Sequence, residues 1–390
     1  MDKVFRVELS GGNRRYCQLD LPATNYELLD ALEQLQRKPG HKPEWEIIEH
    51  TGFQFLHVHL TGECDLYQLN ALATRLGQMT SSDKIAFEGL FNMEVAKKYG
   101  PISIATMVDL AYSTDCCHVV EGVTNDAQLG EFYAENGFMP ELDALPDCVF
   151  QLLDFEKLGE KMRFEDGGIL VNRGYVAQYA DLKQVYDTLT LVPRRPPYAF
   201  RLLIGRYPFE TNEQPEKLVS LELPATPDDL ADALNECGAA SWDEVVFQAE
   251  DSAIPLILDE LDCESIEEIN DLAQAIQYRA GRSELTKLKA VLHAADCRSI
   301  HTATYIAQNL DDYLYEPDQR SAEEVAMEEL RFSLDEKSYQ TLKKHVNLFN
   351  YGMDVIQDTN SIMTPYGLVV RRDGELIEGL EGNPVQMNMQ

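Results

Sequence analysis

Two histidines in the segment FLHVHL, residues 55–60, have a spacing that could bind a metal ion. If this segment is a strand, His57 and His59 project from the same face, and His50 is near in sequence. Imidazoles and carboxylates are common zinc ligands. A partly exposed strand face has the same pattern, and the related segment IPLILDE, residues 254–260, lacks histidine. We therefore predict no metal and no cofactor, and keep a metal-binding protein or an enzyme that uses His57 and His59 as the least favoured alternative.

The run Cys116, Cys117 and His118 places a thiol next to an imidazole. A nucleophile and its base must face one another, and neighbours in a chain rarely do. The related segment QNLDDYLYE, residues 308–316, contains neither residue type. The eight cysteines are scattered without a C-x-x-C pair, which favours reduced and mostly buried thiols. We predict no catalytic residues, and a protein that is not an enzyme.

Glycine-rich phosphate-binding loops are absent, because the sequence contains neither G-x-x-x-x-G-K-[ST] nor G-x-G-x-x-G. The paired glycines of SGGNRRY, residues 10–16, and EDGGIL, residues 165–170, lie between strand-like runs and predict hairpin turns. No apolar run is long enough to span a bilayer. The N-terminus MDKVFRVELSGG lacks the order of a secretory signal, which predicts a cytoplasmic protein.

Charge is the strongest signal in the sequence. Sixty-seven acidic and 33 basic residues give a net charge of −34 and a pI near 4.5. Residues 1–195 hold 30 acidic and 18 basic residues and residues 196–390 hold 37 and 15, so both halves are acidic. Such a protein repels nucleic acid and attracts basic surfaces, including DNA-binding grooves. At one charge per ~1.7 Å, the excess matches about 58 Å, or roughly 17 base pairs, of duplex. Solubility or adaptation to high salt is the alternative explanation.

A repeat is visible in the chain. LDLPATNYELLDAL, residues 19–32, aligns without a gap with LELPATPDDLADAL, residues 221–234. In both segments leucines alternate before the proline and take helical spacing after it. Thr24 and Thr226 stand where a helix N-cap belongs, and Pro227 suits the first helical position. Each segment therefore predicts a strand followed by a capped helix.

The repeat extends along both halves. DLYQLNALATRL, residues 65–76, and SIEEINDLAQAI, residues 265–276, each predict a helix with one apolar face. These faces consist of Leu66, Leu69, Leu72, Ala73 and Leu76, and of Ile266, Ile269, Leu272, Ala273 and Ile276. Further pairs are WEII (45–48) with WDEVV (242–246), SIAT (103–106) with SIHT (299–302), and the turn-plus-strand segments GGILVNR (167–173) and YGLVVRR (366–372).

The order of elements predicts an elongated α+β fold made of two tandem copies of one unit, each built of small α/β and helical subdomains. The predicted first copy is 1–187, with subdomains at about 1–62, 63–115 and 116–176, and the second is 200–376, with subdomains at about 200–260, 261–305 and 306–376. A stiff, exposed Pro/Arg linker is expected at 188–199, within LVPRRPPYAF, and a tail at 377–390.

Two regions of the first copy resemble the antirestriction protein ArdA family, which are acidic DNA mimics carried by mobile genetic elements. They are ECDLYQLNALATRLGQM, residues 63–79, and residues 129–175, and the resemblance covers most of 1–176. The family pattern apolar–Asp–aromatic–x–x–aromatic–Gly is matched by Leu153, Asp154, Phe155, Leu158 and Gly159, with leucine in place of the second aromatic residue. The second copy matches loosely at Leu348, Phe349, Tyr351 and Gly352, without an acidic counterpart of Asp154.

The resemblance implies inhibition of a type I restriction–modification enzyme by occupation of its DNA-binding surface, without a reaction or a cofactor. The family unit is typically a homodimer, so a chain with two copies is expected to be a monomeric pseudo-dimer or a homodimer. The expected partner is a basic DNA-binding protein complex in the cytoplasm of a bacterial host, without direct binding to nucleic acid or membrane. A DNA mimic that inhibits a CRISPR effector is the alternative, because that nucleic-acid channel is also basic.

Acidic residues on the predicted helices and their caps are the candidate contacts of a DNA-mimic surface. They are Glu63, Asp65, Asp154, Glu156, Glu264, Glu267, Glu268, Asp271, Asp311, Asp312, Glu323, Glu324, Glu328 and Glu329. The alternative role of each is ordinary solvation of a helix face.

Overall fold

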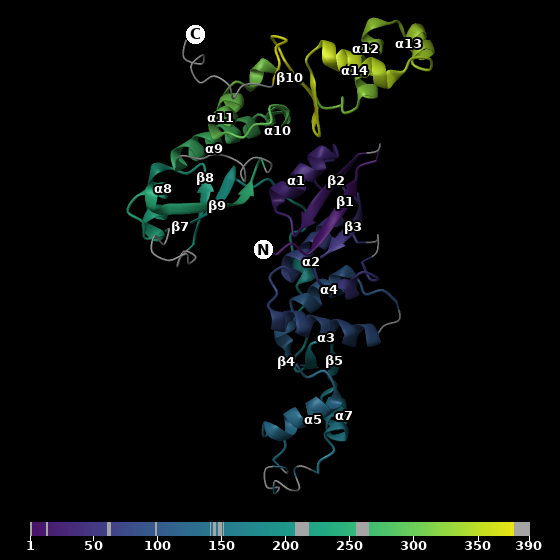
Figure 1. Ribbon diagram of the computed structural model, residues 1–390, viewed down its shortest axis with the longest axis vertical. Coiled ribbons are helices and arrows are strands. Elements are labelled where there is room, and N and C mark those ends of the chain that lie inside the picture. The colour runs from purple at the N-terminus through teal and green to yellow at the C-terminus, as the bar shows by residue number, and fades with distance from the viewer. Residues whose placement is uncertain are drawn as a thin grey trace. The chain divides into compact units, whose positions relative to one another are not determined.

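The computed structural model describes residues 2–12, 15–60, 64–97, 100–140, 142, 146, 150, 152–206, 218–254 and 265–377. The fold class is α+β, with helices and small antiparallel sheets (Figure 1). The chain divides into two compact units. Unit 1 comprises Met1–Ala23 and Pro39–Pro193, and unit 2 comprises Thr24–Lys38 and Arg194–Gln390.

Unit 1 contains two three-stranded antiparallel sheets, with strand orders β2-β1-β3 and β4-β6-β5. The strands are β1 Phe5–Ser10, β2 Tyr16–Leu21, β3 Glu44–His50, β4 Cys117–Glu121, β5 Ile169–Val171 and β6 Gly174–Gln178. The helices are α2 Leu66–Leu76, α3 Ser81–Lys97, α4 Ile104–Ala111, α5 Asp126–Glu135 and α7 Phe155–Asp166, with short 3-10 turns η1 Gln54–Leu56, η2 Thr114–Cys116 and η3 Tyr186–Thr188.

Unit 2 has a similar order of elements, with α8 between β8 and β9 and α13 between α12 and α14 in addition, and its sheets are β8-β7-β9 and β10-β12-β11. The strands are β7 Phe200–Arg206, β8 Val219–Leu223, β9 Val245–Ser252, β10 Tyr313–Glu316, β11 Ile362–Thr364 and β12 Gly367–Arg371. The helices are α8 Pro227–Glu236, α9 Ile266–Gly281, α10 Leu285–Ala294, α11 Ile300–Gln308, α12 Ala322–Ser333, α13 Glu336–Leu342 and α14 Leu348–Asp358, with 3-10 turns η4 Trp242–Glu244 and η5 Leu310–Asp312. Helix α1, Asn25–Gln34, also belongs to this unit.

The strand-to-helix corners have the same construction in both halves. Thr24 caps α1 and Thr226 caps α8, each in a capping box with the carboxylate three residues later, as the sequence predicts. Before each cap, an asparagine side chain closes the corner. The Asn70 side-chain oxygen accepts the N–H of Ala23 at 2.7 Å, and that of Asn270 accepts the N–H of Ala225 at 2.8 Å.

The predicted apolar faces of α2 and α9 form part of the buried interior. All ten residues are at most 2 % exposed: Leu66, Leu69, Leu72, Ala73, Leu76, Ile266, Ile269, Leu272, Ala273 and Ile276. Helical spacing placed these side chains on one face, and burial of that face anchors each helix in its unit.

One of the two predicted glycine turns is correct and the other is wrong. SGGNRRY, residues 10–16, joins β1 to β2 in an antiparallel hairpin, although residues 13 and 14 lie outside the described part. EDGGIL, residues 165–170, is the end of α7 followed by β5. Gly167 has φ 62° and ends the helix in the left-handed conformation, which glycine adopts without steric cost.

The helix pairs α5–α7 and α12–α14 cross at very short distance, and Figure 1 shows both pairs side by side. A Cβ on Gly159 of α7 would lie 1.8 Å from the carbonyl oxygen of Asp126, and one on Gly352 of α14 would lie 1.8 Å from that of Ala322. Because Gly159 and Gly352 are each the fifth residue of their helix, the two crossings use the same positions. Gly159 therefore has a structural role in packing.

Gly159→Ala is expected to destabilise the α5–α7 pair by about 1–3 kcal/mol, because the added methyl group forces the two backbones apart. Gly281→Ala at the end of α9 is the matched control, since a Cβ there meets nothing within 4 Å. It is expected to be neutral or stabilising by up to about 1 kcal/mol. Amide hydrogen exchange over α5 and α7 measures the effect, and equal exchange in both variants would contradict the close crossing.

Helix α1 packs into unit 2 through a buried ion pair that the sequence did not predict. Lys289 of α10 places its Nζ 2.7 Å from an oxygen of Asp30 and 2.9 Å from one of Glu33. The Tyr366 hydroxyl donates to the same Asp30 carboxylate at 2.9 Å. Arg320 donates to the Gln34 and Glu33 carbonyl oxygens, which fixes the end of α1.

The predicted linker 188–199 contains the boundary between the two units, which falls after Pro193. Its last residues are not exposed as predicted: Tyr198 is 6 % and Ala199 1 % exposed. Tyr198 is part of the core of unit 2, where the hydroxyl of Tyr26 donates to its carbonyl oxygen. Arg194 is exposed, and Arg195 lies 4.0 Å from Glu33 of α1. The proposed tail lies outside the described residues except for Ile377.

Candidate interaction surface

The histidine segment does not form a strand, so the predicted geometry of His57 and His59 is wrong. Residues 54–59 form η1 and a turn. His57 Nδ1 lies 3.2 Å from His50 Nε2, and burial together with the neighbouring His57 lowers the pKa of His50. His59 Nδ1 accepts the N–H of Ile102, and its ring packs against Phe91. Within the described residues, no group of three His, Cys, Asp or Glu side chains is placed to hold a metal ion.

Cys117 and His118 are adjacent but serve separate contacts. The Cys117 thiol donates to the carbonyl oxygen of Thr114, and burial raises its pKa to about 12. The His118 ring stacks on Tyr179 with 4.4 Å between centroids. A thiol held protonated and an imidazole stacked elsewhere do not form a nucleophile–base pair.

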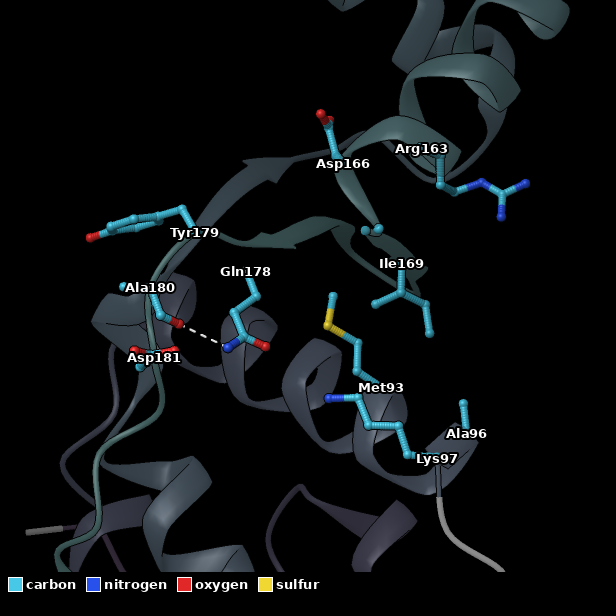
Figure 2. Close-up of a pocket in the computed structure, with 12 residues that line it drawn as sticks. Met93, Ala96, Lys97, Arg163, Asp166, Ile169, Gln178, Tyr179, Ala180 and Asp181 are labelled. Atoms are coloured by element: carbon cyan, nitrogen blue, oxygen red, sulfur yellow. Dashed lines mark hydrogen bonds between the residues drawn. The ribbon is translucent and has the colours of Figure 1, made fainter.

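A pocket of about 960 Å³ lies between α3, the end of α7 and the strand β6 in unit 1 (Figure 2). Two of its charged groups, Arg163 and Asp166, already have structural partners. Arg163 extends away from the pocket centre in Figure 2 and forms a bidentate pair with Asp126, at 2.7 and 2.9 Å. Asp166 accepts the hydroxyl protons of Tyr133 and Tyr175. The pocket therefore offers Lys97, Asp181 and backbone groups rather than a set of converging catalytic side chains.

The candidate acidic residues fall into three groups. Those that are exposed are Asp154, Glu156, Glu267, Glu268, Asp271, Asp311, Asp312, Glu323 and Glu328. Those that are half-buried are Asp65, Glu324 and Glu329. Glu63 and Glu264 lie outside the described residues. The exposed acids are spread over α7 in unit 1 and over α9, η5 and α12 in unit 2.

Several candidates have local structural roles. Asp65 caps α2 and lies 3.0 Å from Lys42. Asp154 caps α7 and lies 2.8 Å from Lys157, and the hydrogen bonds to this residue lower the pKa of its carboxyl. In unit 2 the cap of α14 is Asn347, which shows why a search for an acidic counterpart of Asp154 failed.

The half-buried glutamates and Asp311 also have partners. Glu324 accepts the N–H of Arg320 at 2.9 Å, and Glu329 accepts the hydroxyl proton of Ser333 at 3.0 Å. Asp311 lies 3.4 Å from the buried guanidinium of Arg279. The freely exposed acids at the start of α9 are the strongest members of the predicted set.

The most acidic part of the chain is a segment that the site prediction covered only in part. Residues 218–278 contain no lysine or arginine. Their sixteen acids are Glu222, Asp228, Asp229, Asp232, Glu236, Asp243, Glu244, Glu250, Asp251, Asp259, Glu260, Asp262, Glu264, Glu267, Glu268 and Asp271. Of the twelve that are described, ten are exposed, Glu244 is half-buried and Asp251 is buried. The absence of lysine and arginine from 218–278 is visible in the sequence and could have identified this segment as a candidate surface.

Helix α8 carries the densest part of this segment. Asp228, Asp232 and Glu236 are spaced four residues apart and so lie on one face, while Asp229 belongs to the capping box. The helix has 10 residues, or about 15 Å at ~1.5 Å per residue. Counting Asp229, the helix carries four acids, while the three on the one face are about 6 Å apart along the axis, wider than the ~3.4 Å of a single DNA strand. The only buried residue of α8 is Ala233, so this face is open to a partner.

The fold and this surface define an acidic α+β protein. No protein-family model and no curated protein sequence matches the chain. Among the residues that the structure describes, no helix has the length and apolar character needed to cross a membrane.

Proposed function

We propose that the chain is an acidic DNA mimic that inhibits a DNA-targeting defence enzyme, most directly a type I restriction–modification enzyme, by occupying its DNA-binding surface. The observation that carries this proposal is the segment 218–278, where ten exposed acids occur without a single basic residue. Ordinary soluble surfaces mix both signs of charge. Exposed carboxylates that take the place of DNA phosphates in a basic groove gain the same counterion-release free energy that DNA gains there.

We further propose that the chain is a tandem duplication of an ArdA-like unit. The recurring order of elements, the Asn70 and Asn270 corner contacts and the Gly159 and Gly352 crossings support this origin. The two copies differ in the exposure of the corresponding helices, since α1 is mostly buried and α8 is mostly exposed. On this proposal the second copy supplies the main mimic surface, and the protein acts in the cytoplasm of a bacterial host.

Competition with DNA tests the proposal. A fluorescent duplex bound to a purified type I restriction–modification enzyme is titrated with the full chain, and we expect complete displacement that excess unlabelled duplex reverses. The chain alone should not bind the duplex, because both are anionic. Failure to displace the duplex at saturating chain, or inhibition that excess duplex does not relieve, would contradict occupation of the DNA-binding surface.

A further inference from the structure

Helix α1 is bound in unit 2 by Lys289, Arg320 and Tyr366, which we call the receiving surface. Both the helix and this surface have counterparts elsewhere in the chain. Helix α8 follows the second capped corner as α1 follows the first, so residue 26 corresponds to residue 228. In the helical layers, Arg75 and Arg279 donate to the carbonyl oxygens of Ala111 and Ala307. Each arginine also pairs with an acid at the start of the next helix, residue 83 or residue 284. Gly89 of α3 and Ala290 of α10 are small buried residues of helices that pack on β6 and β12, and aligning them places Glu88 at the position of Lys289.

The side chains by which α1 binds unit 2 are absent from α8. Tyr26, Asp30 and Glu33 of α1 contact unit 2. The residues at these places in α8 are Asp228, Asp232 and Asn235, and Leu29 is replaced by Ala231. All four are exposed. Helix α8 therefore lacks counterparts of the buried Tyr26 and Leu29 and of the Glu33 carboxylate.

The receiving surface is also absent from unit 1. Arg320 stands directly before the cap of α12, and Thr124 stands directly before the cap of α5. Tyr366 precedes Gly367 in the turn into β12, and Arg173 precedes Gly174 in the turn into β6. Lys289, Arg320 and Tyr366 are thus replaced by Glu88, Thr124 and Arg173. Two of the three positions in unit 1 lack the positive charge of unit 2, while Arg173 carries a positive charge where unit 2 has Tyr366.

The α1 contact joins two different surfaces, so it is a heterologous contact. If α8 and unit 1 kept the same groups, every chain would carry one free helix and one free receiving surface. Heterologous contacts between identical chains produce open filaments unless the geometry closes. An acidic helix opposite Glu88 would instead place like charges together at the position where α1 has the Asp30–Lys289 pair.

We propose that the α1 contact is restricted to the C-terminal receiving surface, and that the replacements on α8 and on unit 1 prevent copies of the chain from assembling head to tail. The same replacements leave α8 exposed. This inference does not depend on the proposed inhibitory function, because it concerns only contacts of the chain with itself.

Two full-length variants that restore one side each test the inference. The helix variant D228Y/A231L/N235E gives α8 the face of α1, and the surface variant E88K/T124R/R173Y gives unit 1 the groups of unit 2. Sedimentation velocity is measured on the wild type, on each variant alone and on their equimolar mixture. We expect a 1:1 complex only in the mixture, with an affinity at least 100-fold above that of wild type for itself. Unfolding temperatures near that of wild type show that both variants fold.

Absence of a complex in the mixture, with both variants folded, would overturn the inference. Wild-type association that disappears on Asp228→Lys or Arg173→Glu would also overturn it, because α8 and unit 1 would then already bind one another between chains. The wild-type measurement decides this second point even where a multiple variant does not fold.

Discussion

Lys289→Ala is expected to lower the free energy of unfolding of unit 2 by about 3–5 kcal/mol, the usual cost of leaving a buried charge without its partner. The Lys289 side chain is 3 % exposed and that of Asp30 is 7 % exposed. Removal of the ammonium group leaves the Asp30 carboxylate with only the Tyr366 hydroxyl and the Gln34 amide. Urea denaturation followed by circular dichroism measures the change.

Two further variants separate the ion pair from general effects of substitution. Asp232→Ala on α8 removes the exposed counterpart of Asp30 and is expected to change stability by less than about 0.5 kcal/mol. The double variant K289M/D30L removes both charges and should recover much of the loss, because an apolar pair of similar volume avoids the desolvation cost. A Lys289→Ala variant as stable as the Asp232→Ala variant would show that α1 does not need this pair.

The second large effect is expected from the acidic face of α8. The variant D228N/D232N/E236Q removes three charges and leaves the capping residue Asp229 in place. Each contact contributes about 0.9 to the slope of log affinity against log salt concentration. Three contacts therefore contribute up to ~500-fold in affinity at ~0.1 M salt relative to ~1 M salt. We therefore expect binding to the target enzyme to weaken by two to three orders of magnitude, with unchanged unfolding temperature.

A charge-matched control distinguishes an effect of the α8 surface from an effect of the net charge of the chain. The variant E131Q/E135Q/E160Q neutralises three exposed acids on α5 and α7 of unit 1. Its net charge equals that of the α8 variant, and we expect less than a tenfold loss of affinity. Equal losses in both variants would show that α8 has no special role in the complex.

The sequence predicted those elements whose signals are local. Capping at Thr24 and Thr226 depends on residues three positions apart, and the apolar faces of α2 and α9 depend on helical spacing, so both predictions are confirmed. The strand expected for His57 and His59 was wrong. Alternating residues there suggested a strand, but the segment forms η1 and a turn that packs Phe53 and Leu56 inward.

The contacts of α1 could not be predicted from the sequence. Asp30 occupies a position that a helical pattern assigns to solvent, and its partner Lys289 is 259 residues away. An acidic residue next to an apolar stripe looks the same whether it is solvated or paired in a core. For the candidate surface, composition revealed the acid excess, but only the burial of α1 and the exposure of α8 distinguish the two copies.

The salt dependence of binding tests the central claim most directly. The affinity of the full chain for a type I restriction–modification enzyme is measured by isothermal titration calorimetry between 50 and 400 mM salt. If the chain replaces DNA through α8 and the start of α9, the logarithm of the association constant should fall linearly with the logarithm of salt concentration, with a slope of about −4.5 to −6.3 for five to seven contacts. A slope near zero would contradict DNA mimicry.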